Sequence, residues 1–228
     1  MKKRVAILGS TGSIGKSLLN IIKRDKKNFH IILLTANKNY KDLLKQAKIF
    51  DVKNIIITDK KYYQIAKFKN QSKKINIYNN FDIFKKVFKS KIDYVMSSIV
   101  GLDGLYPTIQ IIKYTKKIAI ANKESIICGW NLIKKKLVKF NTKFIPIDSE
   151  HFSIFELIKN ENSKNIKKIY ITASGGPFLK TNHLNLRQFN PKNAIKHPTW
   201  KMGKKISVDS ANLMNKVFEI IEACKIFN

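Results

Sequence analysis

Cysteine, acidic residues and long apolar runs are all scarce in this chain of 228 residues. The two cysteines, Cys128 and Cys224, are isolated and lack metal-site spacing, which argues against a disulfide scaffold and favours a reduced compartment. No stretch approaches the length of a membrane span, and the apolar run Val5–Leu8 is too short for a signal peptide. We therefore expect a cytoplasmic protein with no membrane partner.

The shortage of acids gives the chain a strong positive charge. Its 15 Asp and Glu stand against 45 Lys and Arg, for a formal net charge of +30. This balance leaves a basic nucleic-acid-binding protein open as one interpretation. The lysines, however, are spread along the whole chain among abundant Ile, Asn, Phe and Tyr, residue types that share A/T-rich codons. Codon bias is the better explanation, so we expect no specific nucleic-acid partner, although such a surface favours phosphorylated substrates.

Strand-like and helix-like segments alternate from the start of the chain, and 44% hydrophobic residues suit a folded protein. Strands are predicted at 4–8, 29–34, 54–58, 92–99, 117–121 and 143–148, and helices at 14–24, 41–50, 81–89, 105–115 and 124–139. This alternation predicts an α/β fold whose N-terminal part is a Rossmann-like, doubly wound parallel sheet.

The rhythm changes after Glu150. A helix is predicted at 150–159, a strand at 166–173 and a final helix from 208 or 209 to 227. Between the last two lies a long loop, 175–205, that holds three of the five prolines. We therefore expect two domains, 1–148 and 149–228, with a mobile loop near 195–205.

A glycine-rich turn, Gly9-Ser-Thr-Gly12-Ser-Ile-Gly15, lies between the first predicted strand and helix. In this position glycines let the backbone approach a pyrophosphate at a helix N-terminus, which predicts a dinucleotide site. The second strand leads into Asn37-Lys38-Asn39, with no acid to hold ribose hydroxyls and a lysine that could pair with a 2′-phosphate. The pattern favours NADPH over NADH, while a plain surface lysine is the alternative.

Two of the scarce acids lie close together in Asp148-Ser149-Glu150, after a short apolar strand. Carboxylates at the carboxyl end of a strand can converge on a small hard cation such as Mg²⁺ or Mn²⁺. Asp148 could instead cap the following helix, with Glu150 in its first turn, and local sequence alone favours this arrangement. Both interpretations stay open.

The glycine-rich turn and the segment after the second strand, together with four later runs, resemble 1-deoxy-D-xylulose 5-phosphate reductoisomerases. The runs are Ala121–Ser125, Asp148–His151, Ala173–Phe178 and His197–Gly203 leading into Ile206–Glu219. Their order and spacing are specific, and the resemblance covers essentially the whole chain. It implies conversion of 1-deoxy-D-xylulose 5-phosphate to 2-C-methyl-D-erythritol 4-phosphate, a step of isoprenoid precursor synthesis, with NADPH and Mg²⁺ or Mn²⁺ (Co²⁺ being a third option).

The resemblance also implies roles for particular residues. The metal ligands would be Asp148, Glu150 and Glu219, and the catalytic groups Lys123, Asp148, Glu150 and His197. The substrate, a small phosphorylated sugar, would contact Lys123, Ser149, Glu150, Ser174, His197, Ser210, Asn215, Lys216 and Glu219. The cofactor would contact Thr11, Gly12, Ser13, Ile14, Asn37, Lys38, Asn39, Asn122, Glu124 and Gly203. Trp200 and Met202 would belong to a loop that closes over the substrate.

The chain departs from the family pattern in two ways. Asn37 stands where the family has a glycine, and the sequence ends at Asn228, whereas the family continues with more catalytic domain and a helical domain. We therefore expect a truncated α/β catalytic domain after the Rossmann-like part, and a homodimer only for a full-length form. An NADPH-binding remnant without turnover is the main alternative.

Overall fold

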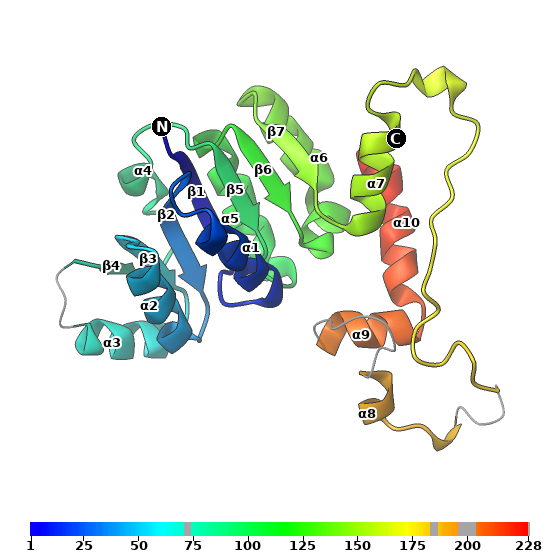
Figure 1. The fold of residues 1–228 in the computed structure, drawn as a ribbon, viewed down its shortest axis with the longest axis horizontal. Helices are drawn as coiled ribbons and strands as arrows, with labels where there is room; N and C mark the ends of the chain where they lie inside the picture. Colours follow the sequence, from blue (N-terminus) through cyan, green and yellow to red (C-terminus); the bar gives the residue numbers. More distant parts are fainter. Residues whose placement is uncertain (71–73, 183–186, 196–203, 228) are drawn as a thin grey trace. The chain divides into compact units, whose positions relative to one another are not determined.

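The computed structural model describes residues 1–70, 74–182, 187–195 and 204–227. Contacts within the chain divide it into two compact units, Met1–Ile147 and Asp148–Asn228. Each unit has its own arrangement of elements, and we describe them in turn (Figure 1).

The first unit is built on one seven-stranded parallel sheet with the order β4-β3-β2-β1-β5-β6-β7. Its strands are β1 (Lys3–Leu8), β2 (Phe29–Ala36), β3 (Asn54–Ile57), β4 (Asn76–Tyr78), β5 (Tyr94–Ser97), β6 (Lys117–Ile120) and β7 (Lys143–Pro146). The order runs outward in opposite directions from β1, which pairs with β2 on one side and β5 on the other. The expected doubly wound α/β sheet is confirmed.

The helices of this unit fill the connections between the strands. They are α1 (Ser13–Arg24), α2 (Tyr40–Ile49), α3 (Lys60–Lys69), α4 (Phe84–Val87), α5 (Leu105–Ile111) and α6 (Lys123–Lys139), with short 3₁₀ turns η1 (Leu102–Gly104) and η2 (Ile112–Tyr114). Four successive residues of β1, Val5 to Leu8, are all buried. Because neighbouring side chains of a strand point to opposite faces, both faces of the sheet are covered.

The second unit consists of helices and connecting segments in the described residues. They are α7 (Ser149–Ile158), the 3₁₀ turn η3 (Ser163–Asn165), α8 (Pro191–Ala194), α9 (Lys204–Ala211) and α10 (Met214–Phe227). Asp148 is the N-cap of α7, where its carboxylate accepts a hydrogen bond of 3.4 Å from the Glu150 backbone N–H.

Two predictions in the second unit were wrong. The segment 166–173 is not a strand, because a strand needs a hydrogen-bonded neighbour and none pairs with it among the described residues. The predicted last helix is two helices, since Leu213 adopts a left-handed backbone with φ 61°. The Asn212 side chain then accepts a hydrogen bond of 3.0 Å from Met214 N–H, which starts α10.

In the first unit, the helix expected at 81–89 is reduced to the four residues of α4. Phe88 is extended and buried, with its ring packed 5.6 Å from that of Tyr114, so tertiary packing ends the helix early. The helix α3 and strand β4 were not predicted. Their segments have little apolar periodicity, and Ala66 is the one fully buried residue of α3.

Candidate functional site

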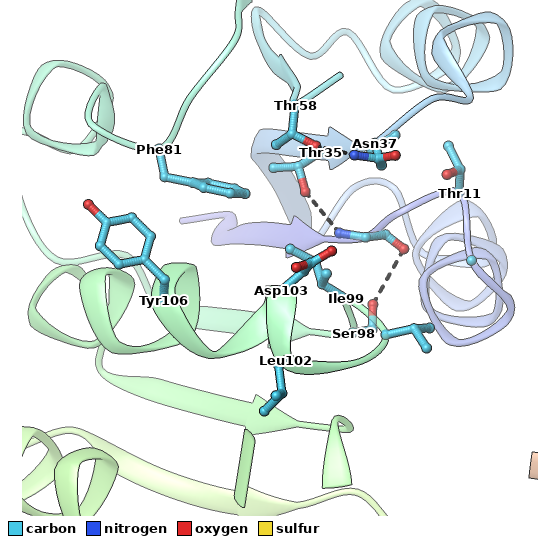
Figure 2. A pocket seen from close by; sticks show the side chains of 14 residues that line it. Thr11, Thr35, Asn37, Thr58, Phe81, Ser98, Ile99, Leu102, Asp103 and Tyr106 are labelled. Carbon is cyan, nitrogen blue, oxygen red and sulfur yellow. Dashed lines mark hydrogen bonds between the residues drawn. The ribbon is translucent and has the colours of Figure 1, made fainter. Parts of the chain in front are cut away.

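A crevice opens in the first unit where the strand order reverses, at the carboxyl ends of β1 and β5. Its volume is about 720 Å³. Figure 2 shows side chains from the ends of several strands and from the η1–α5 segment meeting around it. The residues that line it are Gly9, Thr11, Gly12, Thr35, Ala36, Asn37, Thr58, Phe81, Ser98, Ile99, Val100, Leu102, Asp103 and Tyr106. Ligands of doubly wound sheets bind at such a reversal.

The three glycines of the first turn serve different purposes. Gly9 has φ +82°, and a Cβ there would lie 2.7 Å from the Ser98 carbonyl oxygen; a Cβ on Gly15 would lie 2.6 Å from the Gly9 carbonyl oxygen. Both are therefore required by packing of the turn. Gly12 has an ordinary φ of −76°, and its Cβ would meet nothing closer than 3.4 Å. Its bare, exposed backbone leaves room for a ligand to approach α1.

The N-terminus of α1 suits an anion. Gly12 is its N-cap and supplies no side-chain hydrogen bond, and the first turn, which is fully described, holds no acidic residue. Ser13 and Ile14 belong to that turn. Backbone N–H groups and the helix dipole at such an end attract phosphate groups.

A buried polar network fixes the glycine turn, and sequence reasoning missed it. The Thr35 hydroxyl accepts a hydrogen bond of 2.9 Å from Gly9 N–H, while the Ser10 hydroxyl donates to Gln46 Oε1 at 2.8 Å. The Gln46 amide in turn donates to the Ser10 carbonyl at 3.0 Å. A buried serine inside a glycine motif was the clue, because such a hydroxyl needs partners.

The segment after β2 carries three predicted cofactor residues, all exposed. Asn37 lines the crevice and donates a hydrogen bond of 2.8 Å to the Thr58 hydroxyl. Lys38 follows it, and Asn39 is the N-cap of α2, accepting from Asp42 N–H at 3.3 Å. Asn39 therefore has a structural role beside any contact with a ligand.

Three further predicted residues begin α6 after the end of β6. Asn122 is buried and caps the helix, accepting from Ser125 N–H at 2.7 Å and donating to the Gly101 carbonyl at 2.6 Å. It thereby ties α6 to the β5–α5 connection. Lys123 is buried in the first turn, and Glu124 beside it is half-buried.

The second unit brings three predicted metal ligands together. Carboxylate oxygens of Asp148, Glu150 and Glu219 all lie within 4.8 Å of one another. Two come from the start of α7 and the third from α10, so residues 69 or more positions apart in sequence meet across the two helices. Oxygen ligands of this kind suit a hard divalent cation.

Lys216 and Asn215 lie against this cluster. The Lys216 ammonium is 3.4 Å from Glu150 Oε1 and also donates to Glu219 and to the Thr172 carbonyl. Asn215 donates to Glu219 Oε1 at 2.5 Å. Burial raises the pKa of Glu150, but hydrogen bonds with Asp148, Ser149 and its own backbone, together with the Lys216 charge, outweigh burial and lower it to about 2.

His151 and Glu222 join the cluster although sequence reasoning did not assign them a role. The fully buried His151 ring lies with Nε2 2.8 Å from the Glu219 carbonyl and Nδ1 3.4 Å from Glu222. Oxygen and nitrogen atoms of Asp148, His151 and Glu222 also lie within 4.8 Å of one another. Each of the two missed residues follows a predicted ligand by three positions on a helix, and that spacing was the available clue.

The loop after residue 173 packs on the end of α9. A Cβ on Gly176, which has φ +68°, would lie 2.6 Å from the Ser210 carbonyl oxygen. This close approach brings the loop that follows the exposed Ser174 against the end of α9, which carries Ser210. His197, Trp200, Met202 and Gly203 lie outside the described residues.

Comparison with known sequences decides the family. A model described as 1-deoxy-D-xylulose 5-phosphate reductoisomerase matches residues 5–129, and a model of that enzyme's C-terminal domain matches residues 144–227. The chain belongs to the 1-deoxy-D-xylulose 5-phosphate reductoisomerase family. The resemblance of the sequence motifs is thereby confirmed.

Members of this reductoisomerase family match along nearly the whole chain. The enzyme of Pelagibacter ubique is 60% identical over 228 residues, and that of Wolbachia pipientis from Culex pipiens is 43% identical over 226 residues, each covering 99% of this chain. The chain spans 59% and 58% of the length of these relatives.

Solved structures of the family share the fold. The reductoisomerase of Zymomonas mobilis in complex with NADPH superposes with a TM-score of 0.87 at 36% identity, covering 100% of this chain and 59% of its own. A reductoisomerase in complex with NADPH, fosmidomycin and magnesium gives a TM-score of 0.89 at 34% identity, covering 99% and 58%. No helix within the described residues has the length and apolar character to cross a membrane.

Proposed function

We propose that this chain carries the NADPH-binding and cation-binding parts of a reductoisomerase that converts 1-deoxy-D-xylulose 5-phosphate to 2-C-methyl-D-erythritol 4-phosphate. The observation that carries the proposal is the convergence of Asp148, Glu150 and Glu219 in a member of this family. Relatives solved with NADPH and magnesium support both ligands. We place the protein in the cytoplasm, in keeping with its isolated cysteines.

The crevice of the first unit would hold NADPH. Its volume lies within the range of small-molecule sites, and the uncapped start of α1 beside Gly12 suits the pyrophosphate. The exposed Lys38 would pair with the 2′-phosphate, and Asn37 would donate to it or to the ribose. Asn122 and Glu124 would contact the nicotinamide half. NADPH supplies the hydride when bound.

The carboxylate cluster would hold Mg²⁺ or Mn²⁺, which supplies Lewis-acid polarisation of substrate oxygens when bound. Two features of the chain fit that role. Glu150 is held as a carboxylate by its lowered pKa, and Glu219 is oriented by the Asn215 amide. His151, bonded to the Glu219 carbonyl, keeps α10 in register with α7.

The substrate phosphate would lie near Ser174 and Ser210, since the nearby Gly176 packs against the Ser210 backbone, with Asn215 and Lys216 on the next helix. Ser149 and Glu150 would contact the reacting end of the sugar.

The test uses the purified chain with 1-deoxy-D-xylulose 5-phosphate, NADPH and Mn²⁺, followed by the loss of NADPH absorbance. We expect oxidation that stops on chelation. Glu219→Gln keeps the shape of the side chain but removes one charged ligand, so Mn²⁺ affinity should fall by more than about 100-fold and oxidation should stop. Glu156→Gln, at an exposed position of α7 paired with Lys159 at 3.6 Å, is the matched control.

Mn²⁺ binding is also measured directly by calorimetry, because it does not depend on turnover. Unchanged Mn²⁺ affinity in Glu219→Gln would overturn the cation site. Binding of NADPH and Mn²⁺ without any oxidation would reduce the proposal to a binding protein for both.

A further inference from the structure

The lining residues indicate in which direction a dinucleotide would lie along the crevice. The uncapped start of α1, at Gly12, marks the place of the pyrophosphate, and Asn37 at the end of β2 marks the ribose next to it. A dinucleotide that passes from one to the other continues toward the ends of β3 and β4. The part of the crevice lined by Thr58 and Phe81 is therefore where its base arrives, if the proposed NADPH function holds.

Phe81 is held at this end by two sets of contacts. Its turn is anchored to the end of β3, where the Asn79 amide donates to the Ile57 carbonyl at 2.8 Å and to the Thr58 carbonyl at 3.3 Å. Its ring rests 5.6 Å from that of the buried Phe84, which belongs to an aromatic cluster with Phe88 and Tyr114. The ring is thus a supported wall, with its other side on the crevice.

Tyr106 lines the same end of the crevice, but it follows β5, the strand on the other side of β1. It lies in the first turn of α5, is 55% exposed, and its hydroxyl donates to Asp82 Oδ1 at 3.4 Å. That bond joins α5 to the turn that carries Phe81. Figure 2 shows both rings at one end of the crevice, on the far side from Thr11. Val100 and Leu102, also exposed, add apolar surface to the lining.

We propose that Phe81 and Tyr106 form an aromatic clamp for the adenine base of NADPH. A purine presents a flat π-face and little hydrogen-bonding demand above and below its plane. Such a face stacks well on aromatic side chains, and stacking changes affinity by roughly tenfold or more for each base. The clamp deepens the proposed function, because it assigns the residues that bind one part of its cofactor.

The test compares Phe81→Leu and Tyr106→Leu with the parent chain, using adenosine 2′,5′-bisphosphate as probe. Each variant should raise the dissociation constant about tenfold. Each should also reduce the upfield ring-current shift of the adenine protons in the bound ligand, which a general loosening of the fold would not do selectively. Binding of reduced nicotinamide mononucleotide, which lacks adenine, should not change. Phe68→Leu, at an 89% exposed aromatic of α3, is the matched control.

The outcomes separate this clamp from the function on which it rests. A parent chain that binds neither probe overturns the NADPH function. A parent chain that binds the bisphosphate, with both variants equal to it in affinity and in proton shifts, overturns the clamp alone. Thermal unfolding identifies a variant that does not fold, and Tyr106→Leu, at an exposed position, then carries the test.

Discussion

Asp93 shows how much one carboxylate can depend on its neighbours. It accepts hydrogen bonds from the Lys116 ammonium at 2.8 Å and from Arg4 N–H at 2.9 Å. These contacts, the Lys116 bond first, hold the pKa of Asp93 below its ordinary value of 3.8. A lowered pKa in the folded state means that the unfolded chain binds the proton first, so stability falls as the pH falls below that value.

We therefore expect Asp93→Asn to reduce the free energy of unfolding near neutral pH and to lose this deficit as the pH drops through the lowered pKa. Chemical denaturation over a pH series measures the effect. Asp51→Asn, at an exposed position whose φ of 51° asparagine tolerates, should show no such convergence. A constant deficit at every pH would contradict the assignment.

At the same scale, the sequence pointed to the charged candidate residues more readily than to the aromatic and polar ones. Asp148, Glu150 and Glu219 were identifiable because acids are rare and their runs match a family pattern. Phe81 and Gln46 were not, because aromatic and amide residues occur throughout the chain. Only the folded sheet shows that Phe81 lines the crevice and that Gln46 hydrogen-bonds to Ser10 of the glycine turn.

At the scale of elements, the turn between β1 and α1 has one glycine needed for packing and another that leaves room for a ligand. We expect Gly12→Ala to fold with unchanged stability, since its φ is ordinary and its Cβ has room, but to weaken NADPH binding at least tenfold by crowding the phosphates. Gly15→Ala should instead lower the melting temperature, because its Cβ would overlap the Gly9 carbonyl. Calorimetry and NADPH titration of both variants check this pair; equal loss of stability in the two would contradict it.

The break between α9 and α10 depends on an unfavourable backbone at Leu213. Its side chain is 53% exposed, so replacement costs little packing. Leu213→Gly should raise the stability of the second unit by about 1 kcal/mol by relieving the left-handed strain, whereas the β-branched Leu213→Val should lower it. Urea denaturation followed by far-UV circular dichroism measures both changes, and a Gly variant less stable than the Val variant would contradict the argument.

Elements with strong local patterns were predicted from sequence, and those decided by distant contacts were not. The buried runs of β1, β2 and β3 are mostly apolar, and these strands were placed within two residues. The strand expected at 166–173 has the alternation of a strand, but pairing is a non-local property that alternation does not supply. The early end of α4 likewise depends on Tyr114, far along the chain.

For the whole molecule, the two candidate sites belong to different units. The crevice is lined by residues of Met1–Ile147 and the carboxylates belong to Asp148–Asn228. A ligand at 100 times its dissociation constant stabilises the unit that binds it by about 2.7 kcal/mol. In calorimetry, NADPH should therefore raise the transition of the first unit and Mn²⁺ that of the second. Gly12→Ala should reduce only the first effect and Glu219→Gln only the second; both ligands raising one transition alike would contradict this division.

The reversal of strand order at β1 has a consequence for how this protein can change. The gap above β1 and β5 results from the route of the chain, with connections leaving β1 toward opposite edges of the sheet. Substitutions along its rim can alter which molecule it prefers, but they do not close it. The topology of the sheet determines that the crevice exists, and the residues that border it determine which ligand it binds.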